Sequence, residues 1–260
     1  MALLYNRRYH LTVTAGGLQK SWSDLDLSFR VSKTITSEPN ELELTLFGLN
    51  DDSRALLQAP NATIVLEAGY QEEYGVIFSG TIGDVQEDGS FPDQAVVVRA
   101  SDGASQMRQT PMSISISAGL SGKEALNQVL KATGLKAADS ALSEIRTLTR
   151  GIALVGSPAT ILDAITAAQG ISWSVQDGEV HVLPATGSGV VVVVDEPIGR
   201  LSKRIEAGKT LISFRTLLRA AIRPGVLVKV GGYQVVTQTV EHSGELPGQN
   251  WYSDVEGLIR

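Results

Sequence analysis

The sequence has 260 residues, 43% hydrophobic and 19% charged, which are the proportions of a folded protein rather than a disordered chain. Its 22 basic and 28 acidic residues give a formal net charge of −6, and 5% are aromatic, so it lacks both the basic surface and the stacking side chains of a nucleic-acid-binding protein. The absence of cysteine excludes disulfides and thiolate metal sites.

The first part of the chain, from Tyr9 to Arg99, is predicted to be β-rich. Apolar and polar residues alternate over 25–32 and again over 42–46, and a period of two places successive side chains on opposite faces of a half-buried strand. Asp51-Asp52 ahead of Ala55 favours a short helix over 50–58. Further strands are expected at 63–68, 76–85 and 95–100, with loops at 69–75 and 87–94.

A helical pattern follows near the middle of the chain. Ser121 and Glu124 have the spacing of a capping box, and Gly134 is expected to end the helix that they begin. A second helix is predicted from Ser157-Pro158 to Gln169. The expected buried faces of the two helices are Leu126, Val129, Leu130 and Thr133, and Ile161, Leu162, Ile165 and Ala168.

The Asp177-Gly178 pair predicts a hairpin between strands at 172–176 and 179–183. Residues 185–189 are typical of a linker, and strands are expected again at 190–194, 201–206, 211–217, 226–230, 233–241 and 251–256. The run 190–194 is too short to enter a membrane and is interpreted as a buried strand. The predicted fold is mainly β, with two similar tube-type β-barrel or sheet domains, 1–104 and 189–260, flanking a small α/β middle domain, 105–188.

The two β blocks share a short motif. Residues 89–94 and 244–249 both follow the pattern Gly-x-apolar-Pro-x-Gln at a constant offset of 155, and each lies between two predicted strands. Upstream, Pro60 and Pro224 each precede a further strand. We interpret the blocks as two copies of one supersecondary unit. Two similar β domains in one chain can lie side by side around an axis, so that a trimer has approximate six-fold symmetry.

Several segments resemble the baseplate hub proteins of contractile phage tails, a tube-to-spike adaptor family that also occurs in phage-tail-like injection machines. In the first block these segments are 40–50, 65–70 and 77–82, and in the last block Leu217-Leu218, 222–225, 233–236, 240–244 and Trp251. The middle block fits by position and size only. The resemblance implies a structural protein of the virion tail baseplate, made in the host cytoplasm, without enzymatic activity.

The implied assembly is a homotrimeric ring with pseudo-six-fold symmetry that joins the tail tube to the central spike and lets DNA pass. The implied partners are other copies of the chain, the tube or tube-initiator protein, the spike protein and other baseplate proteins, with no specific nucleic-acid binding. Because the sequence ends at Arg260, soon after the second β block, we expect no fused spike or lytic domain. The pair Arg7-Arg8 is followed by no apolar run, so neither a signal peptide nor membrane insertion is expected.

No catalytic, cofactor-binding or metal-ligating residues are predicted. In residues 119–124 the glycine spacing is too short for a nucleotide loop, and Glu124 follows Lys123 where Ser or Thr is needed, so a helix cap is favoured. The histidines of the chain are His10, His181 and His242. The sequence has no Gly-x-Ser-x-Gly elbow, the motif that presents a serine nucleophile for a histidine base to activate. His242 is expected at a strand end beside a loop.

Two other function classes stay open. A tail-associated peptidoglycan hydrolase needs only two carboxylates, for which Asp51-Asp52 and Glu72-Glu73 are candidates, although both pairs occur where solvated acids are ordinary. A receptor- or carbohydrate-binding tail module is also compatible with a β-rich chain, although few aromatic residues are available for stacking on sugars.

Overall fold

The computed structural model describes residues 6–89, 94–103, 107–108, 111–131, 133–138, 145–167, 169–184 and 190–260. The protein is mainly β with a small helical portion, as predicted. Its first part comprises β1 (Arg7–Ala15), β2 (Leu18–Trp22), β3 (Leu27–Thr34), β4 (Glu41–Phe47), α1 (Asp51–Leu57), β5 (Thr63–Tyr70), β6 (Tyr74–Asp88) and β7 (Ala95–Ser101). The middle comprises β8 (Met112–Ile116), α3 (Gly122–Leu130), β9 (Lys136–Ala137), β10 (Ile152–Gly156), α4 (Pro158–Ala167), β11 (Ile171–Gln176) and β12 (Glu179–Pro184). The last part comprises β13 (Val191–Val194), β14 (Ile198–Glu206), β15 (Lys209–Leu217), β16 (Leu227–Val230), β17 (Tyr233–Leu246) and β18 (Trp251–Ile259).

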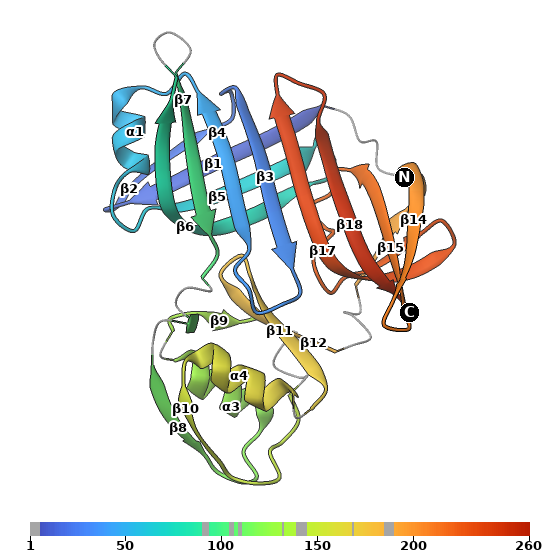
Figure 1. Cartoon of the computed structure of the whole chain (residues 1–260). Coiled ribbons are helices and arrows are strands. Elements are labelled where there is room, and N and C mark those ends of the chain that lie inside the picture. Colours follow the sequence, from blue (N-terminus) through green and yellow to red (C-terminus); the bar gives the residue numbers. More distant parts are fainter. Residues whose placement is uncertain are drawn as a thin grey trace.

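The first and last parts of the chain form one continuous sheet of 13 strands. Their junction is the antiparallel pair of β17 with β3, which lie side by side at the centre of Figure 1. The two parts also share a core, because Trp251 at the start of β18 is fully buried against Phe29 of β3, with ring centroids 5.2 Å apart. The middle part forms two smaller sheets with α3 and α4 and has a separate apolar core.

The two ends of the chain have the same strand order. Hydrogen-bonded neighbours follow the order β3-β4-β7-β6-β5-β1 in the first part and β14-β15-β18-β17-β16-β13 in the last, so each of these six strands has a counterpart in the other part, whereas β2 has none. We call these two sets the first repeat and the second repeat. One strand differs in direction, because β1 is antiparallel to β5 whereas β13 is parallel to β16. The shared order is the relationship that the short sequence motif predicts.

A β-bulge occurs at the same place in both repeats. In the first repeat the register between β6 and β7 shifts between Ile82 and Asp84. In the second repeat the register between β17 and β18 shifts between Thr237 and Thr239. The two bulges are 155 positions apart, which is the offset of the loop motif. Because a bulge bends a strand locally, its repetition indicates that β6 and β17 bend at equivalent points.

The turns that enter β5 and β16 are also equivalent. Asn61 and Gly225 both have a left-handed backbone, with φ of 56° and 82°, a conformation that Asn and Gly adopt at low cost. The next residue in each turn, Ala62 or Val226, accepts a hydrogen bond from the amide just before the bulge, at 2.8 Å and 3.0 Å respectively. The likeness of the repeats therefore extends from strand order to individual hydrogen bonds.

The capping box, the second helix and the hairpin predicted for the middle part are confirmed, whereas the first helix ends at Leu130 and does not continue to Gly134. Ser121 and Glu124 form a reciprocal capping box on α3, and the hydrogen bonds from Ser121 lower the pKa of Glu124. The second helix is α4, with Ile161, Leu162 and Ile165 buried as predicted. The β11–β12 hairpin turns at Asp177-Gly178. Strands β8, β9 and β10 were not predicted; β9 spans two residues, too few for a periodic pattern.

Some predicted boundaries are wrong. Residues 69–75 are not a single loop, because the amide of Tyr70 donates to the Glu73 carbonyl at 2.8 Å and closes a tight turn between longer strands. Likewise β6 continues to Asp88, into the predicted loop 87–94. Residues 90–93 of that loop, Ala168 and the linker 185–189 lie outside the described residues.

The run 190–194 is not a buried strand. Val190, Val191 and Val193 are all exposed, because β13 pairs with β16 on one side and lies at an edge of the sheet. His242 also differs from its prediction. It is fully buried inside β17 rather than at a strand end, since pairing with β3 extends β17 as far as Leu246.

Candidate functional site: the polar face of the sheet

One face of the continuous sheet is polar across eight strands, four from each repeat. Period-two alternation buries Leu27, Phe29 and Val31 of β3 on the other face, and the pairing registers keep the polar positions in line from β14 to β6. The polar side chains of this face are Ser202, Arg204 and Glu206 (β14), Lys209, Ser213 and Arg215 (β15), Tyr252, Asp254 and Glu256 (β18), Thr239, Glu241, Ser243 and Glu245 (β17), Ser28, Arg30, Ser32 and Thr34 (β3), Glu41, Glu43 and Thr45 (β4), Arg99 and Ser101 (β7), and Thr81, Asp84, Gln86 and Asp88 (β6). We call this set the polar face.

Ion pairs cross the polar face from strand to strand. Arg215 donates to both carboxylate oxygens of Asp254 at 2.8 Å, a bidentate contact that raises the pKa of Arg215. Arg99 lies 3.4 Å from Glu43 and 3.5 Å from Asp84, and so links three neighbouring strands. These groups are largely exposed, so each pair contributes little to stability. Their arrangement instead sets the charge of the surface.

The polar face is acidic. Of the side chains that define it, nine are acidic and five are basic. The four arginines each lie in an ion pair with at least one of these acids, at 2.8–3.5 Å. A surface in which paired arginines are outnumbered by carboxylates repels a phosphate backbone and binds it poorly.

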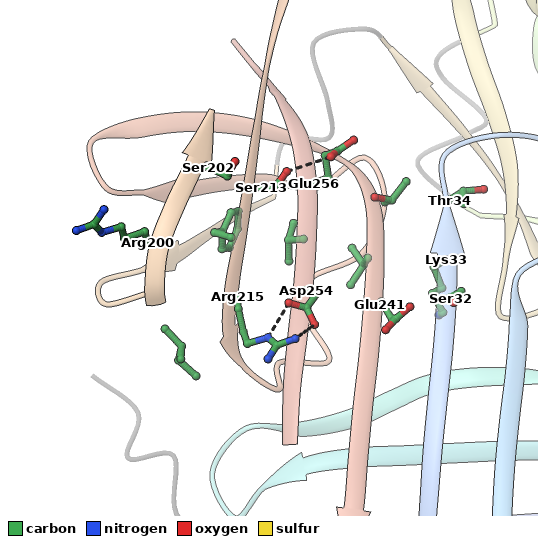
Figure 2. Close-up of a pocket in the computed structure, with 15 residues that line it drawn as sticks. Ser32, Lys33, Thr34, Arg200, Ser202, Ser213, Arg215, Glu241, Asp254 and Glu256 are labelled. Atoms are coloured by element: carbon green, nitrogen blue, oxygen red, sulfur yellow. Dashed lines mark hydrogen bonds and ion pairs between the residues drawn. The ribbon is translucent and has the colours of Figure 1, made fainter. Parts of the chain in front are cut away.

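A shallow groove of about 540 Å³ lies on this face, over the strands between β14 and β3 (Figure 2). Figure 2 shows Arg215 directed at Asp254 and Ser213 directed at Glu256, the latter joined by a 3.0 Å hydrogen bond. The three carboxylates of the groove, Glu241, Asp254 and Glu256, are each in an ion pair with an arginine. Each carboxylate of the groove therefore already has a cationic partner, an arrangement that suits a charged surface.

A buried ion pair joins the 13-stranded sheet to the middle part of the chain. Lys33 of β3 is 1% exposed, and its Nζ lies 2.7 Å and 2.8 Å from the two carboxylate oxygens of Asp177 in the β11–β12 turn. Burial lowers the pKa of Lys33, and the charge of Asp177 opposes this shift. The signal in the sequence is that Lys33 occupies an inward position of the alternation that includes Val31, where an apolar residue is expected.

Asn40 joins the same two parts through a buried amide network. Its side-chain nitrogen donates to Asp102 at 2.6 Å and to the Val175 carbonyl at 2.7 Å, and its oxygen accepts from the Thr34 amide at 2.9 Å. The side-chain amide of Gln176 also donates a hydrogen bond to β3, to the Thr34 carbonyl at 2.9 Å. Burial raises the pKa of Asp102 to about 7, against the lowering effect of the Asn40 hydrogen bonds. We call Lys33, Asn40, Asp102, Gln176 and Asp177 the module clamp.

A serine–histidine pair occurs in the second repeat. His242 Nδ1 lies 2.8 Å from Ser253 Oγ, and burial lowers the pKa of His242 to about 3. Both residues are sealed in the core, and Ser253 Oγ also accepts a hydrogen bond from the Arg219 amide. Since a nucleophile must reach its substrate, this geometry indicates a structural hydrogen bond between β17 and β18. Burial also lowers the pKa of His181, in β12.

The candidate carboxylates of the hydrolase hypothesis lie apart from the groove. Asp51 and Asp52 occupy the first turn of α1, capped by Asn50, and Glu73 in the β5–β6 turn lies 3.8 Å from Arg219. Within the described residues, no three His, Asp or Glu side chains converge as a metal site requires. In the same part of the chain, no helix is long and apolar enough to cross a membrane.

No protein-family model matches the sequence, and no curated protein matches it. Solved structures do match the fold. A tail protein from Neisseria meningitidis superposes with a TM-score of 0.69 and 11% identity, over 97% of this chain and 96% of that one. The 43 kDa tail protein of prophage MuSo2 from Shewanella oneidensis has a TM-score of 0.68 and 10% identity, over 97% and 98% of the two chains.

A third similar structure belongs to a secretion system. It is the c3393 protein of E. coli, a type VI secretion component described as structurally similar to the phage T4 tail proteins gp27 and gp5, with a TM-score of 0.64, 10% identity and coverage of 95% of this chain and 76% of that chain. At these identities the comparisons establish a shared fold along nearly the whole chain.

Proposed function

We propose that the protein is a structural subunit of a phage-type tail, a baseplate hub that forms a trimeric ring with pseudo-six-fold symmetry between the tail tube and the central spike. The observation that carries this proposal is the repeat of one strand order within a single continuous sheet. Two equivalent units in one chain are what an adaptor needs if it meets a six-fold tube with three subunits. The fold shared with two tail proteins and a secretion component supports the same role.

In this ring the polar face lines the central channel. A continuous β surface that is hydrophilic and acidic provides a wall along which DNA slides without being held, because each phosphate is repelled rather than paired. The apolar faces of both repeats lie on the opposite side of the sheet and supply the protein cores. The ring therefore acts through its shape and charge, and no chemical step is assigned to it.

The three predicted domains, 1–104, 105–188 and 189–260, have separate roles in this proposal. The outer two form the ring, and the middle one projects from it, held by the module clamp. The tube or tube-initiator protein and the spike bind opposite ends of the ring, and other baseplate proteins surround it. The site of action is the tail baseplate of a virion or of a related injection machine.

The proposal is tested by assembly. The purified chain, alone and mixed with the tube and spike proteins encoded beside its gene, is measured by light scattering and imaged by electron cryo-microscopy. We expect a trimer whose channel is lined by the polar face and which binds tube and spike at opposite ends. A chain that remains monomeric in every mixture would exclude the hub.

A further inference from the structure

The junction between the repeats is a strand pair that involves only half of β17. Residues 233–236 of β17 pair with β16, and residues 239–246, beyond the bulge, pair with β3 on the same edge. The bulge thus marks the point at which β17 leaves a strand of its own repeat and joins a strand of the other. Strand β3 belongs to the first repeat, and its counterpart in the second repeat is β14.

The counterpart of this junction is unfilled in the single chain. Residues 84–88 of β6, beyond the equivalent bulge, pair with β7 on one edge, and no strand among the described residues pairs with the other edge. Strand β14 pairs with β15, and the described chain supplies no strand for its second edge either. The two open edges are those of β6 and β14, the outermost of the eight strands that form the polar face, and they lie on opposite sides of Figure 1.

We infer that residues 84–88 of one copy pair antiparallel with β14 of a second copy, in the way that β17 pairs with β3 within the chain. This inference rests on the proposed ring and deepens it by naming the two surfaces that close it. Open edges attract strands of other chains, and a head-to-tail contact between two different edges generates a ring when its rotation closes.

The internal repeat also predicts the register. In each repeat, a row of directly paired residues runs across four strands from the residue just before the bulge. In the first repeat this row is Ile82, Ala100, Leu42 and Val31. In the second repeat it is Thr237, Gly257, Ile212 and Lys203. Lys203 is therefore the counterpart of Val31. Within the chain Val31 pairs with His242, whose counterpart at the offset of 155 is Glu87. Glu87 of one copy is thus expected opposite Lys203 of the next.

At this register most of the charges complement one another. The open half of β6 carries Asp84, Glu87 and Asp88, and β14 carries Arg200, Lys203, Arg204 and Glu206. Glu87 faces Lys203 and Asp88 lies diagonally across from Arg204, whereas Asp84 faces Glu206. Two positions from the Glu87–Lys203 pair, the same register places Val85 opposite Ile205. Ile205 is 72% exposed in the single chain, and Val85 packs against the core of the first repeat. The contact would therefore cover an apolar side chain that lies open on an edge strand.

Pairing of each edge with its own kind fits the charges less well. Two β14 strands side by side would place basic residues near basic residues, and two β6 edges would bring acidic residues together. Such an isologous contact would also end at a dimer, because both partners use the same edge. The charges favour the head-to-tail pair of β6 with β14.

The chain has no native cysteine, so a cysteine pair reports this contact directly. The variant carrying Val85→Cys and Ile205→Cys is oxidised and run on a non-reducing gel. We expect disulfide bonds between copies and a covalent trimer, because residues opposite each other on antiparallel strands have the Cβ separation that a disulfide needs. The matched control, Val85→Cys with Lys203→Cys, is two residues out of register and should cross-link about an order of magnitude less.

A charge exchange tests the same contact without new covalent bonds. Lys203→Glu and Glu87→Lys should each raise the concentration needed for assembly roughly severalfold, and the two together in one chain should restore it. A trimer that neither cross-links in the predicted register nor responds to the charge exchange would overturn this inference and leave the ring standing. Equal cross-linking in both registers would also overturn it. A persistent monomer in the presence of tube and spike proteins would remove both the ring and its proposed edges.

Discussion

Lys33 and Asp177 lie 144 residues apart in the chain, yet Lys33 Nζ contacts both oxygens of the Asp177 carboxylate. Lys33 lies on the inward side of β3, and Asp177 occupies the turn of a hairpin in the middle part of the chain. Since both charges are largely removed from water, the pair stabilises only the structure in which sheet and hairpin are docked. It is the central contact of the module clamp.

Replacing one partner of this pair should be costly. We expect Asp177→Asn to lower the free energy of unfolding by about 3–5 kcal/mol, because it leaves the Lys33 charge buried without a counter-ion. Asn is compatible with the left-handed backbone of Asp177, with φ of 56°, so the turn itself is preserved. Denaturant titration of the purified protein measures the change.

Two matched variants separate charge from packing. Lys33→Met combined with Asp177→Asn should regain much of the lost stability, since no isolated charge remains in the interior. Glu179→Gln alters an exposed charge in the same hairpin and should change stability by less than about 0.5 kcal/mol. Equal losses for Asp177→Asn and Glu179→Gln would contradict the role assigned to the pair.

Asp102 should make the module clamp sensitive to pH. Its pKa is about 7 in the folded protein, above the ordinary value near 3.9 of an unfolded chain. Between these values the folded protein holds a proton that the unfolded chain has released. The stabilising contribution is therefore complete below about pH 4 and is lost as the pH rises through 7.

The measurement compares the wild type with Asp102→Asn, which cannot titrate at this position. The stability of the wild type relative to the variant should fall by on the order of a few kcal/mol between pH 4 and pH 8. Thermal or denaturant unfolding at both pH values gives the difference. A difference that does not change with pH would show that Asp102 keeps its ordinary acidity.

Gly244 should not tolerate a side chain, although its backbone would accept one. A Cβ atom there would lie 2.4 Å from ring atoms of Phe29 and 2.7 Å from Trp251, the residue of β18 that is buried in the core of the first repeat. We expect Gly244→Ala to destabilise the protein by about 1–3 kcal/mol through overpacking. Gly83→Ala is the control, because its Cβ would meet nothing closer than 3.8 Å. Similar losses in the two variants would contradict this prediction.

The proposed lining of the channel predicts how charge affects DNA. Glu41→Lys combined with Glu245→Lys places two new cations on the polar face, at exposed positions. The assembled ring should then bind DNA at low salt and lose that binding as salt is raised. Glu38→Lys combined with Glu179→Lys makes the same change in net charge away from the polar face and should bind DNA less. Electrophoretic mobility shifts compare the two, and equal binding would argue against the polar face as the lining.

Much of the fold could be predicted because its signals are local. Alternation over 25–32 and 42–46 determines strands with one buried face, since successive side chains point to opposite sides. The Ser121–Glu124 box and the Asp177-Gly178 turn depend on contacts within a few residues. The repeat at an offset of 155 was visible because both copies keep the same loop residues, and it predicted the matching strand order.

Tertiary structure alone decided how these parts meet. The sequence determined that β3 and β17 are strands, but only the pairing of their edges made one sheet, buried His242 and left Val190, Val191 and Val193 exposed. Lys33 marked an anomaly in its strand, but the identity of its partner depended on where a distant hairpin came to rest. The physical reason is that side-chain periodicity specifies which face of a strand is buried, whereas hydrogen bonds along its edges accept any strand that arrives in register.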